Sequence, residues 1–187
     1  MRVIAGEARG RVLRGPPPGS STRPTPDRVR EALFQILGDI DGLRVLDLFA
    51  GTGALGIEAL SRGARSATFV EGDRRVARVL EQNVAKAGVG SRSTILRMEV
   101  LAALAGPLSA PRPVRGFDLV LADPPYGSGL LPRTLEAVVA VAAPGATVVA
   151  EHATRDAPPA APGLALFDSR RYGDTTMSFY RLTEAPT

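Results

Sequence analysis

Five short apolar runs, separated by segments with helical spacing, organise most of this chain of 187 residues. The runs start 23 to 29 residues apart and lie at residues 44–48, 67–71, 94–98, 118–122 and 147–151. Between two of them, apolar residues recur every three or four positions, at Val76, Val79, Leu80, Val84 and Ala87. Strands that alternate with helices in this way form βαβ units. Because the strands are continuously apolar, we expect an α/β fold whose parallel sheet is covered on both faces.

The two ends of the chain depart from this repeat. Residues 164–172 and 175–182 are strand-like runs around Gly173-Asp174, which predicts an antiparallel hairpin that closes the sheet. Near the start, Thr25 is suited to cap a helix, Pro26 to its first position and Asp27 to its first turn. We therefore expect a small basic extension over residues 1–38, which contains one helix. The main domain should follow over residues 39–187.

The basic excess of the chain is confined to its first thirty residues. The net charge is +4, and these thirty residues hold seven arginines against Glu7 and Asp27. The arginines are Arg2, Arg9, Arg11, Arg14, Arg23, Arg28 and Arg30. Guanidinium groups bind phosphates bidentately, so the cluster favours contact with a nucleic acid over a merely solvated basic tail.

Composition excludes several kinds of chemistry. The chain has no cysteine, which excludes a thiolate nucleophile, and a single histidine, which excludes a metal site built from several His or Cys ligands. No signal peptide is apparent, and the longest apolar stretch is interrupted by Pro144-Gly145, so we expect a cytoplasmic protein with no membrane span.

A glycine-rich loop follows the first apolar run. Gly51, Gly53 and Gly56 have the GxGxxG spacing, and Glu71 ends the next run 20 residues after Gly51. This pattern fits a dinucleotide, S-adenosylmethionine or simple close packing of a helix on a strand. Asp47 precedes the loop, and its carboxylate suits a cofactor with a positively charged amino-acid end better than a pyrophosphate.

The fourth run ends in a second motif, Asp123-Pro124-Pro125-Tyr126. Ligands bind beyond the carboxyl ends of parallel strands, so Asp47 and Asp123 should open onto one crevice. An exocyclic base amine is a poor nucleophile because its lone pair is delocalised into the ring. The Asp123 carboxylate and the Pro124 carbonyl can accept its N–H groups, the two prolines fix the backbone, and Tyr126 can stack on the base.

The run LDLFAGTGALGIEAL (residues 46–60) resembles motif I of the class I methyltransferases. Further segments resemble the bacterial small-subunit rRNA guanine-N2 methyltransferase family over nearly the whole chain. They are RVIAGEARGR (2–11), RPTPDRVREALF (23–34), EALSRGA (58–64) and the residues Tyr172, Gly173, Asp174 and Tyr180.

The resemblance implies a Rossmann-like methyltransferase fold, S-adenosylmethionine as cofactor, and methylation of N2 of a guanine in 16S rRNA, in a partly or fully assembled small subunit. We expect the protein to act as a monomer. The implied cofactor contacts are Asp47, Phe49, Gly51, Gly53, Glu71 at the ribose, Glu99 near the adenine, and Val100. The implied RNA contacts are Arg2, Arg9, Arg11, Arg23, Arg28 and Arg30, some of which could instead order the cofactor site. The family more often has Asp at position 99 and Phe at position 126 of this chain.

Three other functions compete with this hypothesis. An adenine-N6 DNA methyltransferase shares the Asp-Pro-Pro-Tyr motif but usually carries a recognition domain, for which this chain has little room. A non-catalytic RNA-binding assembly factor would not need intact Asp47, Glu71 and Asp123. A nicotinamide oxidoreductase would need a hydride-transfer partner that the sequence does not offer.

Overall fold

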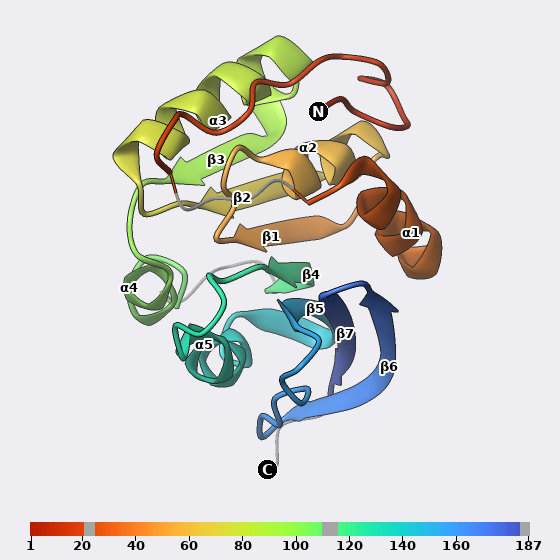
Figure 1. Cartoon of the computed structure of the whole chain (residues 1–187), viewed down its shortest axis with the longest axis vertical. Coiled ribbons are helices and arrows are strands. Elements are labelled where there is room, and N and C mark those ends of the chain that lie inside the picture. The colour runs from red at the N-terminus through yellow and green to blue at the C-terminus, as the bar shows by residue number, and fades with distance from the viewer. Residues whose placement is uncertain (21–24, 110–115, 184–187) are drawn as a thin grey trace.

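The computed structural model describes residues 1–20, 25–109 and 116–183. A seven-stranded sheet with the order β3-β2-β1-β4-β5-β7-β6 forms its centre (Figure 1). The strands are β1 (Arg44–Leu48), β2 (Ser66–Val70), β3 (Ser93–Leu96), β4 (Phe117–Ala122), β5 (Ala142–Ala153), β6 (Leu164–Tyr172) and β7 (Thr175–Leu182). The first five strands are parallel, and β7 pairs antiparallel with both β5 and β6. This confirms the predicted α/β class and the closing hairpin.

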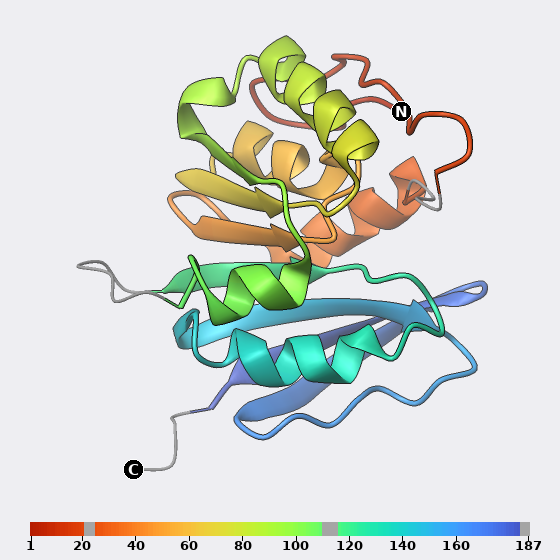
Figure 2. The same ribbon diagram turned by 90° about the vertical axis from the view of Figure 1, so that its left-hand side faces the viewer.

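Helices cover both faces of the sheet (Figures 1 and 2). One face carries α1 (Asp27–Leu37), α2 (Ala54–Ser61) and α3 (Arg74–Ala87), and the other carries α4 (Val100–Ala105) and α5 (Leu130–Val138). A short 3₁₀ helix, η1 (Gly90–Arg92), precedes β3. Alternate residues of β1 point to opposite faces, so Val45 joins the first core and Leu46 the second. None of the helices in the described ranges is long and apolar enough to cross a membrane.

Residues 1–20, here called the N-terminal strap, lie across α2 and α3 rather than extending away from the domain (Figure 1). Val3, Ala8 and Leu13 of the strap are buried in the same core cluster as Leu33 and Phe34 of α1. The predicted extension therefore shares one hydrophobic core with the α1–α3 face of the sheet.

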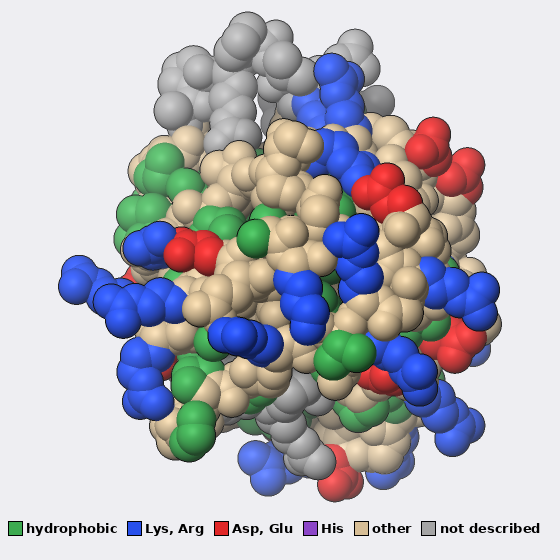
Figure 3. Space-filling view, turned by 90° about the horizontal axis from the view of Figure 1, so that it is seen from above, with side chains coloured by type: hydrophobic (Ala, Val, Ile, Leu, Met, Phe, Trp, Pro, Cys, Tyr) green, Lys and Arg blue, Asp and Glu red, His purple; other side chains and the backbone are tan. Residues whose placement is uncertain are grey.

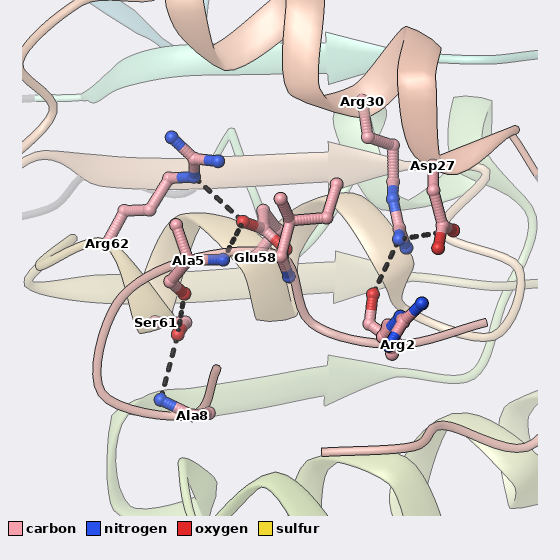
Figure 4. A network of polar contacts seen from close by, with 9 residues as sticks. Arg2, Ala5, Ala8, Asp27, Arg30, Glu58, Ser61 and Arg62 are labelled. Carbon is pink, nitrogen blue, oxygen red and sulfur yellow. Dashed lines mark hydrogen bonds and ion pairs between the residues drawn. The ribbon is translucent and has the colours of Figure 1, made fainter. Parts of the chain in front are cut away.

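Buried polar groups fasten the strap to α2 (Figure 4). The Glu58 carboxylate, which is fully buried, accepts the N–H groups of Ile4 at 2.8 Å and Ala5 at 3.0 Å. The Ser61 hydroxyl accepts the N–H of Ala8 at 2.9 Å and donates to the carbonyl of Ala5. Backbone groups that a loop would otherwise leave unpaired are thus satisfied by side chains of one helix.

Two local expectations were wrong. Pro26, rather than Thr25, is the N-cap of α1, it makes no side-chain capping bond, and the helix starts at Asp27. The strand expected at residues 147–151 is longer, because β5 begins at Ala142 and continues through a register shift relative to β4. The added pairing of Phe117 with Ala142 explains the extension past Pro144-Gly145.

Candidate active site

Each of the five parallel strands contributes a carboxylate at or just beyond its carboxyl end. In the spatial order of the strands, these are Glu99 after β3, Glu71 after β2, Asp47 in β1, Asp123 after β4 and Glu151 in β5. Carboxylates are hydrogen-bond acceptors when ionised and attract positive charge. The edge therefore suits a ligand rich in hydroxyl, amine and cationic groups, whereas a pyrophosphate would be repelled.

The glycine-rich loop is held by two of these acids. Asp47 is 2% exposed, and its Oδ2 accepts the N–H of Gly56 at 2.9 Å. Glu71 Oε2 accepts the N–H of Gly51 at 2.8 Å, and Glu71 Oε1 accepts the N–H of Asp73. The carboxylates thus fix the loop between β1 and α2 from both sides.

Close packing explains two of the three glycines. A Cβ on Gly53, whose φ is +85°, would lie 2.3 Å from Leu80 Cδ1, and one on Gly56 would lie 2.3 Å from Phe69 Cε1. Phe49 has a φ of 59°, a conformation that costs energy for a non-glycine residue and is concentrated at functional sites. The loop is therefore both a packing element and a strained turn.

The predicted adenine end of the site lies after β3. The carboxylate of Glu99 is so placed that a Cβ on Gly72 would lie 2.6 Å from Glu99 Oε1. The next residue, Val100, is 4% exposed and its side chain packs in the second core. A contact between Val100 and a cofactor would therefore come from its backbone.

The Asp123–Tyr126 segment follows β4 and faces the end of β5. Tyr126 is 45% exposed, and its hydroxyl donates to Glu151 Oε1 at 3.0 Å and lies 2.7 Å from Thr175 Oγ1. The carbonyl of Pro125 accepts the Ser128 hydroxyl at 2.7 Å, which closes the turn. The aromatic ring is thus held by its hydroxyl while part of its surface stays open.

A cavity of about 380 Å³ opens beside this segment. Its walls include Pro124, Pro125, Tyr126, Leu131, Pro132 and Glu151. Mostly apolar walls with a few polar groups, here Glu151, His152 and Asp156, are the chemistry expected of a pocket for a flat heteroaromatic group.

Burial raises the pKa values of the acids along this edge. Desolvation, opposed by the Gly56 N–H and assisted by the charge of Glu71, raises the pKa of Asp47 to about 7. Desolvation and then the neighbouring charges of Glu151 and Asp47 raise the pKa of Asp123 well above its ordinary value. Desolvation likewise raises the pKa of Glu151. Perturbed acids gathered along one edge of a sheet are typical of a functional site.

Aligned acceptors of this kind fit S-adenosylmethionine. Glu71 and Glu99 could accept bonds from ribose and adenine, and Asp47 could attract the cationic amino-acid portion. A dinucleotide fits less well, because an ionised Asp47 beneath the loop would repel its pyrophosphate.

The predicted RNA-contacting arginines are exposed, outside the described residues or, in the case of Arg30, buried. The side chains of Arg2, Arg9 and Arg28 are exposed. Arg11 is also exposed, although its Nη1 donates to the carbonyl of Lys86 at 2.7 Å. Arg23 lies outside the described residues.

The prediction for Arg30 was wrong. Its side chain is fully buried, and Nη2 donates to the carbonyl of Arg2 at 2.7 Å and to Asp27 Oδ1 at 2.8 Å (Figure 4). Burial lowers its pKa, and the charges of Asp27 and Glu58 oppose that shift. Arg30 therefore joins α1 to the strap and has no surface with which to reach RNA.

Sequence reasoning missed Glu151, Thr175 and Asn83. Glu151 ends a predicted strand just as Glu71 does, and that position was the available signal. Asn83 is buried in α3, and its Nδ2 donates to the carbonyls of Thr52 in the loop and Arg14 in the strap. No motif marks Asn83, because its partners are backbone atoms far away in sequence.

Comparison with known proteins identifies methyltransferase relatives. The family model described as "Conserved hypothetical protein 95" matches residues 1–181. The Bacillus subtilis (strain 168) protein named "Putative rRNA methyltransferase YlbH" is 35% identical over 97% of this chain and 98% of its own length. "Ribosomal RNA small subunit methyltransferase D" of Escherichia coli (strain K12) is 42% identical over 72% of this chain and 65% of its own length. The solved structure titled "Putative methyltransferase yhhF from Escherichia coli" superposes with a TM-score of 0.83 at 34% identity and covers 97% of both chains.

Proposed function

Because this chain belongs to the conserved hypothetical protein 95 family of methyltransferases, we propose that it methylates the exocyclic N2 of a guanine in 16S rRNA of the small ribosomal subunit. The observation that carries the proposal is the juxtaposition of Asp47 at the end of β1 with Asp123-Pro124 at the end of the adjacent strand β4. A cofactor held by the first group and an amine held by the second would meet at one point of the sheet edge.

S-adenosylmethionine, when bound, supplies an electrophilic methyl group on a sulfonium. Asp47, Gly51, Gly53, Glu71 and Glu99 would hold it, with Phe49 and the Val100 backbone beside them. The protein's remaining task is to orient the amine and to exclude water.

In the proposed reaction, hydrogen-bond acceptors activate the amine, and no strong base is needed. An ionised Asp123 and the Pro124 carbonyl would each accept one N–H of the amine, which turns its lone pair out of conjugation with the ring. The Tyr126 ring, held by its bond to Glu151, would stack on the base. Charge develops on the amine as the methyl group transfers, and Asp123 lies beside that charge and can take up a proton.

A basic surface supports an RNA substrate. Besides Arg9 and Arg11 of the strap, α3 exposes Arg74, Arg75 and Arg78. Figure 3 views this side of the molecule and shows more Lys and Arg than Asp and Glu side chains on it. Such a face attracts a phosphate backbone through salt-dependent contacts that carry no base specificity. We also propose that the protein acts as a monomer in the cytoplasm.

The test is transfer of labelled methyl from S-adenosylmethionine to small ribosomal subunits from a strain that lacks this protein, followed by nucleoside analysis. We expect N2-methylguanosine in 16S rRNA with the unaltered protein and no product with Asp123→Ala, which should still bind the cofactor. Label on adenine would overturn the guanine assignment. Binding to the subunit without any label would favour the non-catalytic assembly factor.

A further inference from the structure

Glu151 has one oxygen engaged and one without a partner. Oε1 accepts the Tyr126 hydroxyl at 3.0 Å. Oε2 is buried and meets no hydrogen-bond donor in the described part of the chain. A buried acceptor left unpaired is costly, and such groups call for an explanation such as a ligand.

Glu151 lies at the edge of the proposed pocket for the target base. Glu151 lines the 380 Å³ cavity together with Pro124, Pro125 and Tyr126. It lies near the carboxyl end of β5, the strand paired with β4, so it lies one strand from Asp123. The electrostatic effect of Glu151 on Asp123 is a second sign of that proximity. Asp123 and Glu151 therefore lie close together, and Glu151 lines the cavity that begins at Pro124, the residue after Asp123.

We propose that Glu151 recognises the Watson–Crick edge of the target base by accepting the N1–H of guanine, while Asp123 accepts an N–H of the neighbouring N2 amine. The inference rests on the proposed function and names the group that selects guanine.

The donor pattern of the bases supports this assignment. Guanine presents N1–H beside the N2 amine, which gives two adjacent donors for two adjacent carboxylates. Adenine presents its N6 amine beside N1, and cytosine its N4 amine beside N3, and both of these ring nitrogens are acceptors. A carboxylate facing such a nitrogen would be unpaired and repelled, and sites of this kind reject analogues strongly.

The test compares guanine with 2-aminopurine, which keeps the 2-amino group but has an acceptor at N1. Small subunits are reconstituted with 16S rRNA that carries either base at the modified position. We expect wild-type kcat/KM to be at least about tenfold higher for guanine, the minimum for loss of one charge-assisted hydrogen bond. Equal rates on the two bases would overturn the inference without any variant.

The same comparison is made with Glu151→Gln, and Glu136→Gln on the exposed surface of α5 serves as the matched control. The glutamine amide can donate to N1 of 2-aminopurine, so the preference for guanine should shrink by about 10- to 100-fold. Glu136→Gln should keep the wild-type ratio, and all three proteins should bind S-adenosylmethionine equally.

The outcomes separate the two proposals. If Glu151→Gln binds the cofactor and keeps the wild-type ratio of guanine to 2-aminopurine, this inference fails and the proposed function stands. If the wild-type protein transfers no methyl group to any guanine N2, the proposed function fails and this inference fails with it.

Discussion

Asp47 should make the free protein less stable as the pH rises, and Asp47→Asn should remove this effect. The carboxyl is buried, it accepts one hydrogen bond from Gly56, and its pKa is raised from 3.8 to about 7 mainly by desolvation. Between these two pH values the unfolded chain has released this proton and the folded protein retains it. Because the folded state binds more protons, the free energy of unfolding falls across that window and levels off above about pH 7.

The size of the effect follows from the two pKa values. The gap from 3.8 to about 7 corresponds to about 4 kcal/mol at about 1.36 kcal/mol per pKa unit. An asparagine keeps an oxygen for the Gly56 N–H but buries an amide N–H₂, at a cost of about 1–3 kcal/mol. At pH 8 without cofactor, Asp47→Asn should therefore be more stable than the wild type by about 1–3 kcal/mol, and it should lose affinity for S-adenosylmethionine.

The assay is urea unfolding of both proteins at several pH values from 4 to 8, without cofactor. The control is Asp118→Asn, because Arg44 holds the pKa of Asp118 below its ordinary value through hydrogen bonds of 2.8 to 2.9 Å. The pKa of Asp118 is 3.8 in the unfolded chain and lower in the folded protein, so both values lie below this range. That variant should therefore be less stable than the wild type by an amount that stays nearly constant from pH 4 to 8. If the free energies of unfolding of Asp47→Asn and the wild type differ by the same amount at every pH, the burial argument is refuted.

Three further predictions concern the strap, the loop and the catalytic acid. Glu58→Ala should lower the free energy of unfolding by about 3–5 kcal/mol in urea titrations, because it removes a buried carboxylate that joins the strap to α2, and a loss below about 1 kcal/mol would contradict that role. Gly56→Ala should cost about 1–3 kcal/mol in the same assay because its Cβ would collide with Phe69, whereas Gly90→Ala, with open space around its Cβ, should be nearly neutral. Methyl transfer should decline as the pH is lowered through the raised pKa of Asp123, since protonation removes an acceptor, and a rate that stays constant down to about pH 4, where an ordinary Asp titrates, would contradict this.

Local sequence signals predicted most of the fold. Strands β1, β6 and β7 have the bounds expected from apolar runs and turn residues, since hydrophobic periodicity and Gly173-Asp174 act within a few residues. The start of β5 was missed because a Pro-Gly pair ordinarily ends a strand, whereas pairing with Phe117 continues it here. That pairing is a long-range property which the local sequence does not carry.

The site was predictable where strand ends carry acids, and less so where tertiary packing decides a side chain's surroundings. The carboxyl ends of parallel strands meet at one edge, so Asp47, Glu71 and Asp123 could be placed together from spacing alone. The same rule applied to the fifth strand would have found Glu151. Arg30 could not be distinguished from its exposed neighbour Arg28, because only the path of the strap decides which of the two is covered.

The strap and the cofactor loop are coupled through one buried amide. Asn83 Oδ1 accepts the N–H of Arg14 at 2.8 Å, while its Nδ2 donates to the carbonyls of Arg14 at 3.0 Å and of Thr52 at 2.9 Å. Moving the strap would therefore leave Asn83 Oδ1 and one Nδ2–H group unpaired in the interior, beside the Thr52 carbonyl of the glycine-rich loop. The basic segment predicted to contact RNA thus also supports the glycine-rich loop, where we propose that the cofactor binds.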